Sequence, residues 1–316
     1  MGSRPIIDPD IYAVATRFPE VKFADADGTR ALFAAMLEAA ASEGGPAHDP
    51  TIAQVERKIP GAPGGPEIRV RIYTPNRRTS GSPVYLSFHG GGFVLGDLET
   101  EHARCLKMSM DGNAVVVSVD YRLAPENPYP ASVEDCYAAL QWAASEATML
   151  GVDRNKIVIG GSSAGGALAA AVALMARDKS GPPIALQMLF YPMLDDRGGT
   201  ESMRTGHDAL VCNSQHVRDM WSHYLGPDRT KVSPYAAPAR AATLANLPPA
   251  YVITCEHDPL RDEGLNYAIL LLQAGVPVEL HNYAGTVHGF DLLIPGAKVS
   301  SRAFDECVAA FRRATT

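Results

Sequence analysis

Cysteine is scarce in this 316-residue sequence, and basic residues are not clustered. The five cysteines are widely scattered and include no C-x-x-C pair, so neither a disulfide framework nor a zinc site is indicated. Lys and Arg number 28 against 35 Asp and Glu, and the net charge of −7 disfavours binding to nucleic acid or anionic lipid. We therefore expect reduced thiols, as in a cytoplasmic protein, and no nucleic-acid partner.

The sequence also lacks a segment suited to crossing a membrane. The N-terminal residues MGSRPIIDPD contain no apolar stretch typical of a secretion signal. Residues 157–176 carry no charge, but glycines and serines crowd their first half, which favours a buried strand, a tight turn and a buried helix. No Walker A, G-x-G-x-x-G or H-E-x-x-H motif occurs, so we expect no cofactor, no metal and no stable membrane insertion.

What the sequence does contain is an alternation of strand-like and helix-like segments. Short apolar or alternating runs predict strands at 68–73, 84–89, 114–120, 157–161, 185–191, 250–255 and 278–283. Helix-like segments lie at 101–111, 132–148, 164–178, 261–274 and 298–313. This order predicts an α/β fold with a mostly parallel sheet covered on both faces.

Two segments break the alternation. Residues 1–50 have a helical pattern, with Thr29 as the predicted N-cap and GGP at 44–46 as the stop. Residues from about 195 to 235 are long, polar in places and carry aromatic residues at helical spacing. We predict N-terminal helices over 1–50 and a main domain over 51–316 that contains the 195–235 segment as an insertion. The N-terminal helices either pack on the surface or form a lid over a pocket.

The segment GSSAG at residues 161–165 lies where a predicted strand ends and a helix begins. G-x-S-x-G in this context is a nucleophile elbow, whose strained turn exposes the serine. Glycines two residues to either side avoid a collision between strand and helix backbones. Ser163 has Gly161 and Gly165 at these positions, whereas Ser162 would have an alanine at one of them. The pattern therefore assigns the nucleophile to Ser163.

A second motif, HGGGF at residues 89–93, directly follows another predicted strand. In α/β-hydrolases a loop of this kind contributes backbone N–H groups to the oxyanion hole. The N–H of Ala164 would be a further donor. The alternative is a flexible glycine loop without this role. We expect His89 itself to anchor the loop rather than to act as a base.

The base and the acid that orients it should follow the nucleophile in the order Ser, Asp, His. Asp258 and His288 each come just after a predicted strand, at the end of the sheet where Ser163 lies. Asp258 could instead cap the next helix, and His288 could be a core histidine. Glu256 and Asp262 are competing carboxylates, although Asp262 suits the first turn of a helix.

The motifs together resemble the bacterial hormone-sensitive-lipase-like esterases of family IV. They are HGGGF, YRLAPE at 121–126 continuing to Pro130 and Ala131, GSSAGG, DPLRDEG and HGF, in family order from His89 to Phe290. The resemblance implies an α/β-hydrolase fold of about eight strands, with a cap from the N-terminal helices and the insertion. It also implies hydrolysis of short- to medium-chain carboxylic esters without a cofactor.

Carried onto this sequence, the resemblance implies a catalytic triad of Ser163, Asp258 and His288. It implies oxyanion-hole donors at Gly90, Gly91 and Ala164. The family commonly has Asp or Thr where this chain has Ser162, a departure that affects the hydrogen bonds beside the elbow. We further expect an apolar substrate pocket, formed by Phe33, Met36, Phe93, Trp221 and Tyr224.

Two other functions fit parts of this pattern. An amidase, peptidase or deacetylase would use the same triad on a small-molecule substrate. A non-catalytic binding protein on this fold, such as the plant gibberellin receptors, lacks the triad histidine, whereas His288 is present here. The natural substrate, the acyl-chain preference and the oligomeric state, with a homodimer among the options, stay open.

Overall fold

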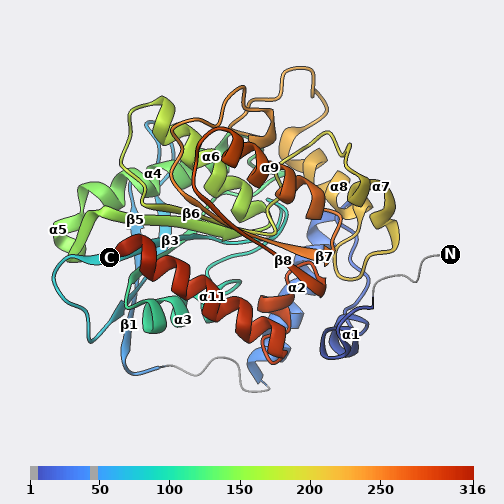
Figure 1. Ribbon diagram of the computed structural model, residues 1–316, viewed down its shortest axis with the longest axis horizontal. Helices are drawn as coiled ribbons and strands as arrows, with labels where there is room; N and C mark the ends of the chain where they lie inside the picture. The colour runs from blue at the N-terminus through green and yellow to red at the C-terminus, as the bar shows by residue number, and fades with distance from the viewer. Residues whose placement is uncertain (1–5, 43–48) are drawn as a thin grey trace.

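The computed structural model describes residues 6–42 and 49–316. It contains an eight-stranded sheet in the order β1-β2-β4-β3-β5-β6-β7-β8 (Figure 1). Strand β2 runs antiparallel to both of its neighbours, β1 and β4, and all other neighbouring strands are parallel. The predicted α/β-hydrolase fold with a mostly parallel sheet is confirmed.

Each predicted strand is present, with ends that shift by a few residues. The strands are β1 Ile52–Ile59, β2 Ile68–Pro75, β3 Ser82–Phe88, β4 Val115–Asp120, β5 Val152–Ser162, β6 Leu186–Phe190, β7 Ala250–His257 and β8 Val278–Val287. The sequence did not identify β1 as a separate strand. It lies at an edge of the sheet, and only its two terminal residues are buried, so its side chains show no clean alternation.

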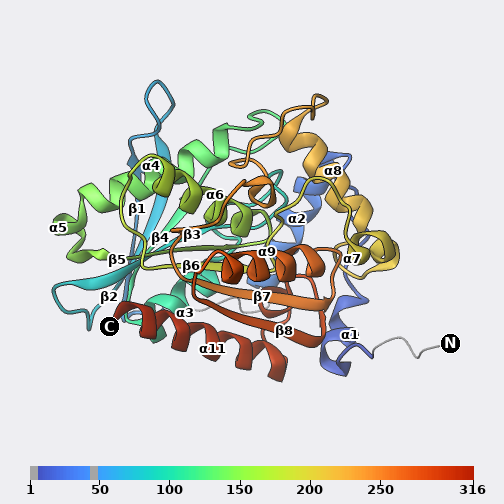
Figure 2. The same ribbon diagram turned by 45° about the horizontal axis from the view of Figure 1, so that its top comes forward.

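Helices cover both faces of the sheet, as Figure 2 shows. Helices α4, α6 and α9 lie on one face, and α3 and α11 lie on the other. Their bounds are α3 His102–Gly112, α4 Ala131–Ser145, α5 Ala147–Leu150, α6 Ala164–Asp178, α9 Arg261–Gln273, α10 Phe290–Leu293 and α11 Lys298–Thr315.

The two-sided cover explains why the central strands are apolar at almost every position. In β4, Val115 and Val117 belong to the core beneath α4 and α6, whereas Val116 belongs to the core beneath α3 and α11. Alternate side chains of a strand point to opposite faces, so a strand buried on both sides needs a continuous apolar run. The five cysteines are free thiols, all buried in this framework.

Four further helices gather at one end of the sheet (Figures 1 and 2). They are α1 Pro9–Ala15, α2 Ala26–Ser42, α7 Glu201–Thr205 and α8 Ser214–Leu225, with the short 3-10 turn Gly206–Asp208 between the last two. The N-terminal pair α1 and α2 contacts the later pair α7 and α8. The ring nitrogen Nε2 of His223 in α8 lies 2.8 Å from the carbonyl oxygen of Phe23, which lies between α1 and α2. Residues far apart in the sequence therefore share one layer above the ends of the strands.

The predicted boundaries of the N-terminal helical segment needed one correction. Helix α2 begins at Ala26, so Thr29 lies inside it, and the Asp25 carboxylate accepts the N–H of Gly28 at 3.0 Å. The Thr29 hydroxyl donates instead to the carbonyl of Lys22. The predicted stop at residues 44–46 lies outside the described residues.

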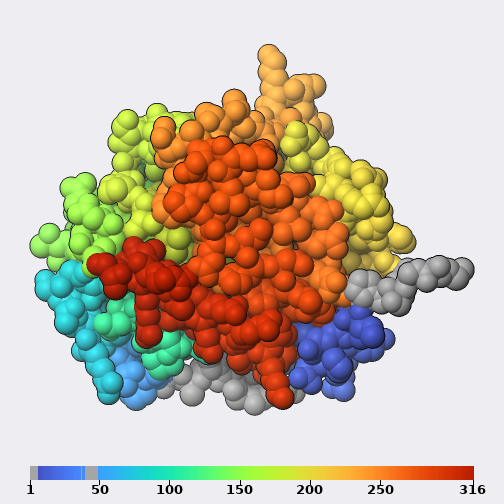
Figure 3. All heavy atoms as spheres, in the orientation of Figure 1, coloured from blue at the N-terminus to red at the C-terminus, as the bar shows by residue number. Residues whose placement is uncertain are grey.

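The C-terminal part of the chain, orange to red in Figure 3, forms the middle of the face shown there. Helix α11 crosses this face, separated from α9 by strands β7 and β8 (Figure 1). Among residues 6–42 and 49–316, no helix is both long enough and apolar enough to cross a membrane.

Candidate active site

The three predicted triad residues follow three parallel strands. Ser163 comes directly after β5, Asp258 directly after β7 and His288 directly after β8. Because these strands run in the same direction, the residues that follow them meet at one edge of the sheet. The fold therefore brings together side chains that are up to 125 positions apart in the sequence, from 163 to 288.

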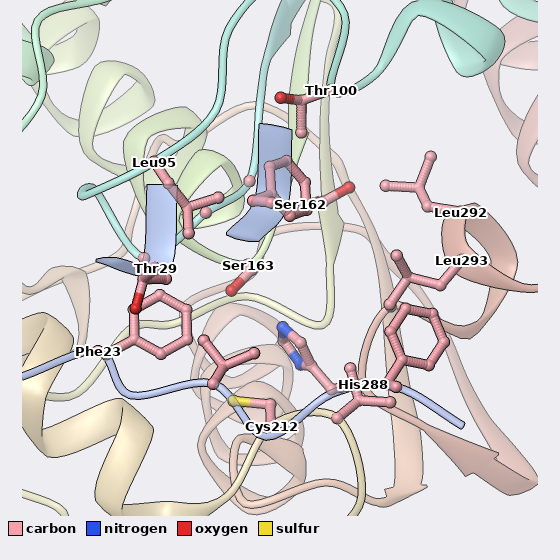
Figure 4. A pocket seen from close by; sticks show the side chains of 18 of the residues that line it. Phe23, Thr29, Leu95, Thr100, Ser162, Ser163, Cys212, His288, Leu292 and Leu293 are labelled. Carbon is pink, nitrogen blue, oxygen red and sulfur yellow. The ribbon is translucent and has the colours of Figure 1, made fainter. Parts of the chain in front are cut away.

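His288 and Asp258 are in direct contact. The Nδ1 atom of His288 lies 2.7 Å from Oδ2 of Asp258, and the Asp258 side chain is fully buried. Its other oxygen accepts the backbone N–H of Leu260 at 2.9 Å. Since Nδ1 faces the carboxylate, it carries the hydrogen and leaves Nε2 as a free acceptor. Figure 4 shows the imidazole and the Ser163 hydroxyl turned into the same pocket.

The two competing carboxylates are engaged elsewhere. Glu256 accepts the backbone N–H of Gly285 at 2.7 Å. Asp262 accepts the N–H of Ser202 at 2.7 Å and the Arg261 guanidinium at 2.8 Å. These bonds hold Glu256 and Asp262 in other parts of the fold, so Asp258 is the carboxylate placed to orient His288.

Ser163 occupies a strained turn between β5 and α6. Its φ of 56° lies in the left-handed region, which is unfavourable for a residue with a side chain. The turn also needs glycine at 165, where a Cβ atom would lie 1.9 Å from the carbonyl oxygen of Phe88. The close approach of strand β3 to the start of α6 thus gives a physical reason for the elbow pattern.

The glycine loop after β3 packs against the elbow. Gly91 has a φ of 116°, and a Cβ there would lie 2.1 Å from the carbonyl oxygen of Leu95. A Cβ at Gly90 would lie 3.1 Å from the carbonyl oxygen of Ser162. Ala164 is the first residue of α6, so its N–H has no acceptor within the helix. The amides of Gly90, Gly91 and Ala164 therefore belong to two segments that touch.

The YRLAPE segment supports the glycine loop from behind. The Tyr121 hydroxyl donates to the carbonyl of His89 at 2.7 Å, and the two rings stack with centroids 4.1 Å apart. His89 in turn contacts the Gly90 carbonyl through Nδ1 at 2.7 Å. Burial lowers the pKa of His89, so this ring stays neutral and acts as an anchor.

Beside Ser163 and His288 lies a cavity of about 400 Å³. No Asp, Glu, Lys or Arg side chain lines it among the residues that the structure describes. In Figure 4, Phe23, Thr29 and Leu95 lie on one side of the pocket, and Leu292 and Leu293 lie on the other. Two predicted pocket residues, Phe33 and Met36 of α2, belong to the lining.

The other three predicted pocket residues do not appear in the described lining of this cavity. The rings of Phe93 and Tyr224 stack on each other with centroids 3.8 Å apart, and the Trp221 ring lies 5.6 Å from that of Phe93. Trp221 is 2% exposed. This aromatic cluster joins α8 to the glycine loop, and Met220, its neighbour in α8, lines the cavity.

Several lining residues were not singled out in the sequence. Cys212 carries a buried thiol whose pKa is raised well above its ordinary value by burial and by the Asp258 charge. Val211 precedes it with a φ of 69°, which is rare for a β-branched residue. Neither residue belongs to a sequence motif. Their place in the pocket depends on how the insertion folds, so no signal in the sequence points to them.

The histidines of the insertion contribute to local structure. His216 completes a capping box with Asn213 at the start of α8, and His223 contacts Phe23 as described above. Within the described residues, no group of His, Cys, Asp and Glu is arranged to hold a metal ion.

Comparisons with known proteins agree with the fold and with the family that the motifs resemble. The family described as alpha/beta hydrolase fold matches residues 85–292. Esterase LipI of Mycobacterium tuberculosis is 41% identical to this chain over 290 residues, which cover 91% of this chain and 88% of the relative. Carboxylesterase NlhH of the same organism is 38% identical and covers 99% of this chain and 97% of its own.

A solved structure shows the same similarity in three dimensions. The structure of a bacterial heroin esterase matches with a TM-score of 0.94 and 42% sequence identity, over 98% of both chains. Identity at this level over nearly the whole length extends the similarity well beyond the motifs. The chain therefore belongs to the hormone-sensitive-lipase-like (family IV) carboxylesterases of the α/β-hydrolase superfamily.

Proposed function

We propose that this protein hydrolyses short- to medium-chain carboxylic esters through a Ser163-His288-Asp258 triad and an acyl-enzyme intermediate. The observation that carries the proposal is the 2.7 Å contact between His288 and Asp258, with Ser163 beside them in an apolar cavity. The similar proteins LipI, NlhH and the bacterial heroin esterase are esterases, which supports the reaction class.

In the first half of the reaction, His288 Nε2 takes the hydroxyl proton of Ser163 while Oγ attacks the ester carbonyl carbon. The carbonyl π electrons move to oxygen and form a tetrahedral oxyanion. Asp258 holds the imidazole in the required tautomer and stabilises the imidazolium that forms. When the intermediate collapses, the imidazolium gives its proton to the departing alkoxide, so the alcohol leaves and Ser163 is acylated.

In the second half, water replaces the alcohol. His288 takes a proton from the water as its oxygen attacks the acyl carbon, which forms a second oxyanion. Collapse of this intermediate breaks the bond to Ser163 Oγ, and His288 returns the proton to that oxygen. The carboxylic acid is released, and the resting enzyme is restored.

The proposed oxyanion hole consists of the N–H groups of Gly90, Gly91 and Ala164. Gly91 and Ala164 lie on fixed backbone, one in a glycine-only conformation and one at a helix N-terminus. Donors held in place before the reaction stabilise the developing charge without reorganisation, and each contributes about 3 kcal/mol in comparable sites.

The lining of the cavity determines which esters fit. A charged acid or alcohol group would lose its hydration in a lining without an opposite charge, which disfavours ionised substrates. A cavity of about 400 Å³ lies within the range of small-molecule sites. We propose that helix α2 of the N-terminal segment and helix α8 of the insertion form the cap that bounds this space, because Phe33, Met36 and Met220 lie in the lining.

Two adjacent serines give a matched test of the proposal. Ser163→Ala should reduce ester turnover by about 10⁶-fold, as for the nucleophile of a serine protease. Ser162→Ala should still turn over the ester, with a rate lowered by no more than about 100-fold through the lost contact beside the elbow, and should lose about 1 kcal/mol of stability for one hydrogen bond. Mass spectrometry after treatment with an organophosphate should find the adduct on Ser163. An adduct on Ser162, or no adduct on either serine, would overturn the proposal.

The substrate class needs a separate measurement. Rates across p-nitrophenyl esters of increasing acyl length should peak at short to medium chains, and the matching p-nitroanilides should react far more slowly. Equal or faster turnover of the anilides would identify an amidase instead.

A further inference from the structure

A buried group of charges lies directly behind the candidate active site. Arg104 of α3 has a side chain only 2% exposed, and it faces two carboxylates, Glu101 and Asp291, whose side chains are 0% and 4% exposed. Its Nε lies 3.2 Å from Glu101 Oε2, and its Nη2 lies 3.0 Å from Asp291 Oδ2. The guanidinium also lies over the ring of Phe190, 4.2 Å from the centroid. A buried ion pair generally adds little net stability, so folding alone gives no strong reason for this group.

The same guanidinium nitrogen contacts both of the segments that carry the reacting residues. Arg104 Nη2 lies 3.3 Å from the hydroxyl oxygen of Ser162, which directly precedes the nucleophile. Asp291 comes three residues after His288, at the start of α10. One nitrogen thus links the nucleophile elbow with the loop that holds the histidine.

Tyr191 completes the connection. Its hydroxyl donates to Asp291 Oδ1 at 2.8 Å and accepts from Arg104 Nη2 at 3.1 Å. The edge of its ring faces the His288 imidazole, with centroids 4.9 Å apart and planes at 67°. Burial raises the pKa of the Tyr191 hydroxyl well above its ordinary value, so it remains a hydrogen-bond donor.

We propose that Arg104, paired with Asp291, is a positioning residue that holds the nucleophile elbow and the histidine loop in register. This inference rests on the proposed function of Ser163 and His288. Both reacting residues lie on turns, Ser163 at a φ of 56° and His288 directly before Gly289 at a φ of 73°. Their mutual placement therefore depends on contacts outside the turns, and a misplacement of about 1 Å can cost about 100-fold in rate.

The serine at 162 is part of the same arrangement. At the position where the family commonly has Asp or Thr, this chain has the Ser162 hydroxyl, which accepts a hydrogen bond from Arg104. Asp291 supplies a carboxylate to the same guanidinium nitrogen. A carboxylate at 162 would be a third acid around one buried cation, next to Glu101 and Asp291, so positions 162 and 291 should depend on each other.

The dependence is tested with a double-mutant cycle. Ser162→Asp adds a buried negative charge, and Asp291→Asn removes one. Each single variant therefore changes the number of carboxylates that face the Arg104 guanidinium. We expect each to lower kcat by about tenfold or more while KM changes less than about threefold, because positioning affects the chemical step. The double variant S162D/D291N restores the number of charges, and its kcat should exceed that of both single variants.

Folding is controlled in the same experiment. Thermal melts and titration of active sites with an organophosphate give the rate per correctly folded molecule. Asp196→Asn is a matched control, because Asp196 is also a buried carboxylate, 2% exposed, in a pair with an arginine, Arg240, at 2.6 Å. It should lower stability but leave kcat per active site unchanged.

The outcomes separate this inference from the proposed function. Wild-type protein that is not labelled at Ser163 would overturn both. Labelling at Ser163 together with an Asp291→Asn variant of unchanged kcat would overturn only the role of Arg104. A kcat of the double variant that does not exceed the kcat of both single variants would also overturn the role of Arg104. A higher kcat in the double variant would establish that positions 162 and 291 act together through Arg104.

Discussion

Arg30 of helix α2 and Glu126 of the YRLAPE segment form a bidentate ion pair, with Nη1–Oε1 and Nη2–Oε2 distances of 2.7 Å. The same guanidinium donates to the carbonyls of Val94 and Ala124 at 2.7 and 2.8 Å. Helix α2 carries Phe33 and Met36 into the cavity. The Arg30 side chain thus attaches this helix both to the end of the glycine loop and to the YRLAPE segment.

Removal of this attachment should loosen the wall of the cavity. We expect Arg30→Ala to flatten the acyl-length profile and to raise KM for the preferred ester, with a loss of stability of about 1 kcal/mol because the pair is partly exposed. Rates across the ester series and thermal melts would measure both effects. Lys58→Ala removes a more exposed ion pair with Glu67, a single contact of 3.9 Å at the edge strand β1, and should leave the profile as it is. An unchanged profile in Arg30→Ala would show that α2 is held without Arg30.

Met220 and Trp221 are neighbours in α8 with different surroundings, and they should respond differently to truncation. Met220 lines the cavity, so Met220→Ala should enlarge it and shift the optimum toward longer acyl chains. The shift should be graded, since one methylene in an apolar pocket is worth about 1–3 kcal/mol. Competition between pairs of esters of different length measures this preference directly. An optimum at the same chain length as in the wild type would contradict the placement of Met220.

Trp221→Ala should act on stability. The indole is buried against Phe93, so its removal leaves a cavity in the core and should cost about 3–5 kcal/mol. Denaturant unfolding measures this loss, and the profile of the remaining folded enzyme should keep its optimum. A large change in chain preference without loss of stability would place Trp221 in the substrate pocket after all.

Asp258→Asn should remove most of the activity while the fold is retained. An amide at this position no longer imposes the Nδ1–H tautomer on His288, and the same change in serine proteases costs about 10⁴ in kcat. Asp262→Asn, four residues along, is the matched control and should affect stability more than rate. If Asp258→Asn kept more than about a tenth of the wild-type rate, another group would have to orient the histidine.

The buried carboxyl of Glu263 should make stability depend on pH. It accepts the backbone N–H groups of Leu194 and Asp195, at 2.6 and 3.2 Å, and burial raises its pKa well above the ordinary value. The folded protein therefore keeps this proton over a pH range in which the unfolded chain has lost it. The stability that the protonated group contributes is complete at low pH and is lost as the pH rises through the pKa of the folded state.

Glu263→Gln keeps an oxygen acceptor for both N–H groups and removes the titration. The difference in unfolding free energy between variant and wild type should be constant below about pH 4 and then grow in favour of the variant, by up to about 1.4 kcal/mol per pH unit. Denaturant unfolding at a series of pH values gives this difference. Glu38→Gln on the exposed surface is the control for loss of a carboxyl, and a curve for Glu263→Gln with the same shape would contradict the prediction.

Sequence rules located the elbow and the glycine loop because each needs glycine at fixed positions within a short motif. Glycine at 165 and at 91 is demanded by backbone contacts within and between short segments, and those contacts leave a pattern that can be read in a single chain. The alternation of apolar runs likewise determined the α/β class, since strands buried on both faces must be apolar throughout. The edge strand β1 has no such constraint, which is why the pattern did not separate it from its surroundings.

The walls of the pocket and the buried charges behind it were decided only by the tertiary structure. Helical spacing shows that Met220, Trp221 and Tyr224 share an apolar stripe, but it does not tell which member faces a cavity and which faces a neighbouring ring. Arg104 and Asp291 are 187 positions apart, and no local rule connects them. Their partnership depends on how helix α3, which follows β3, meets helix α10, which follows β8, in the interior, where the low dielectric requires each buried charge to find an opposite one.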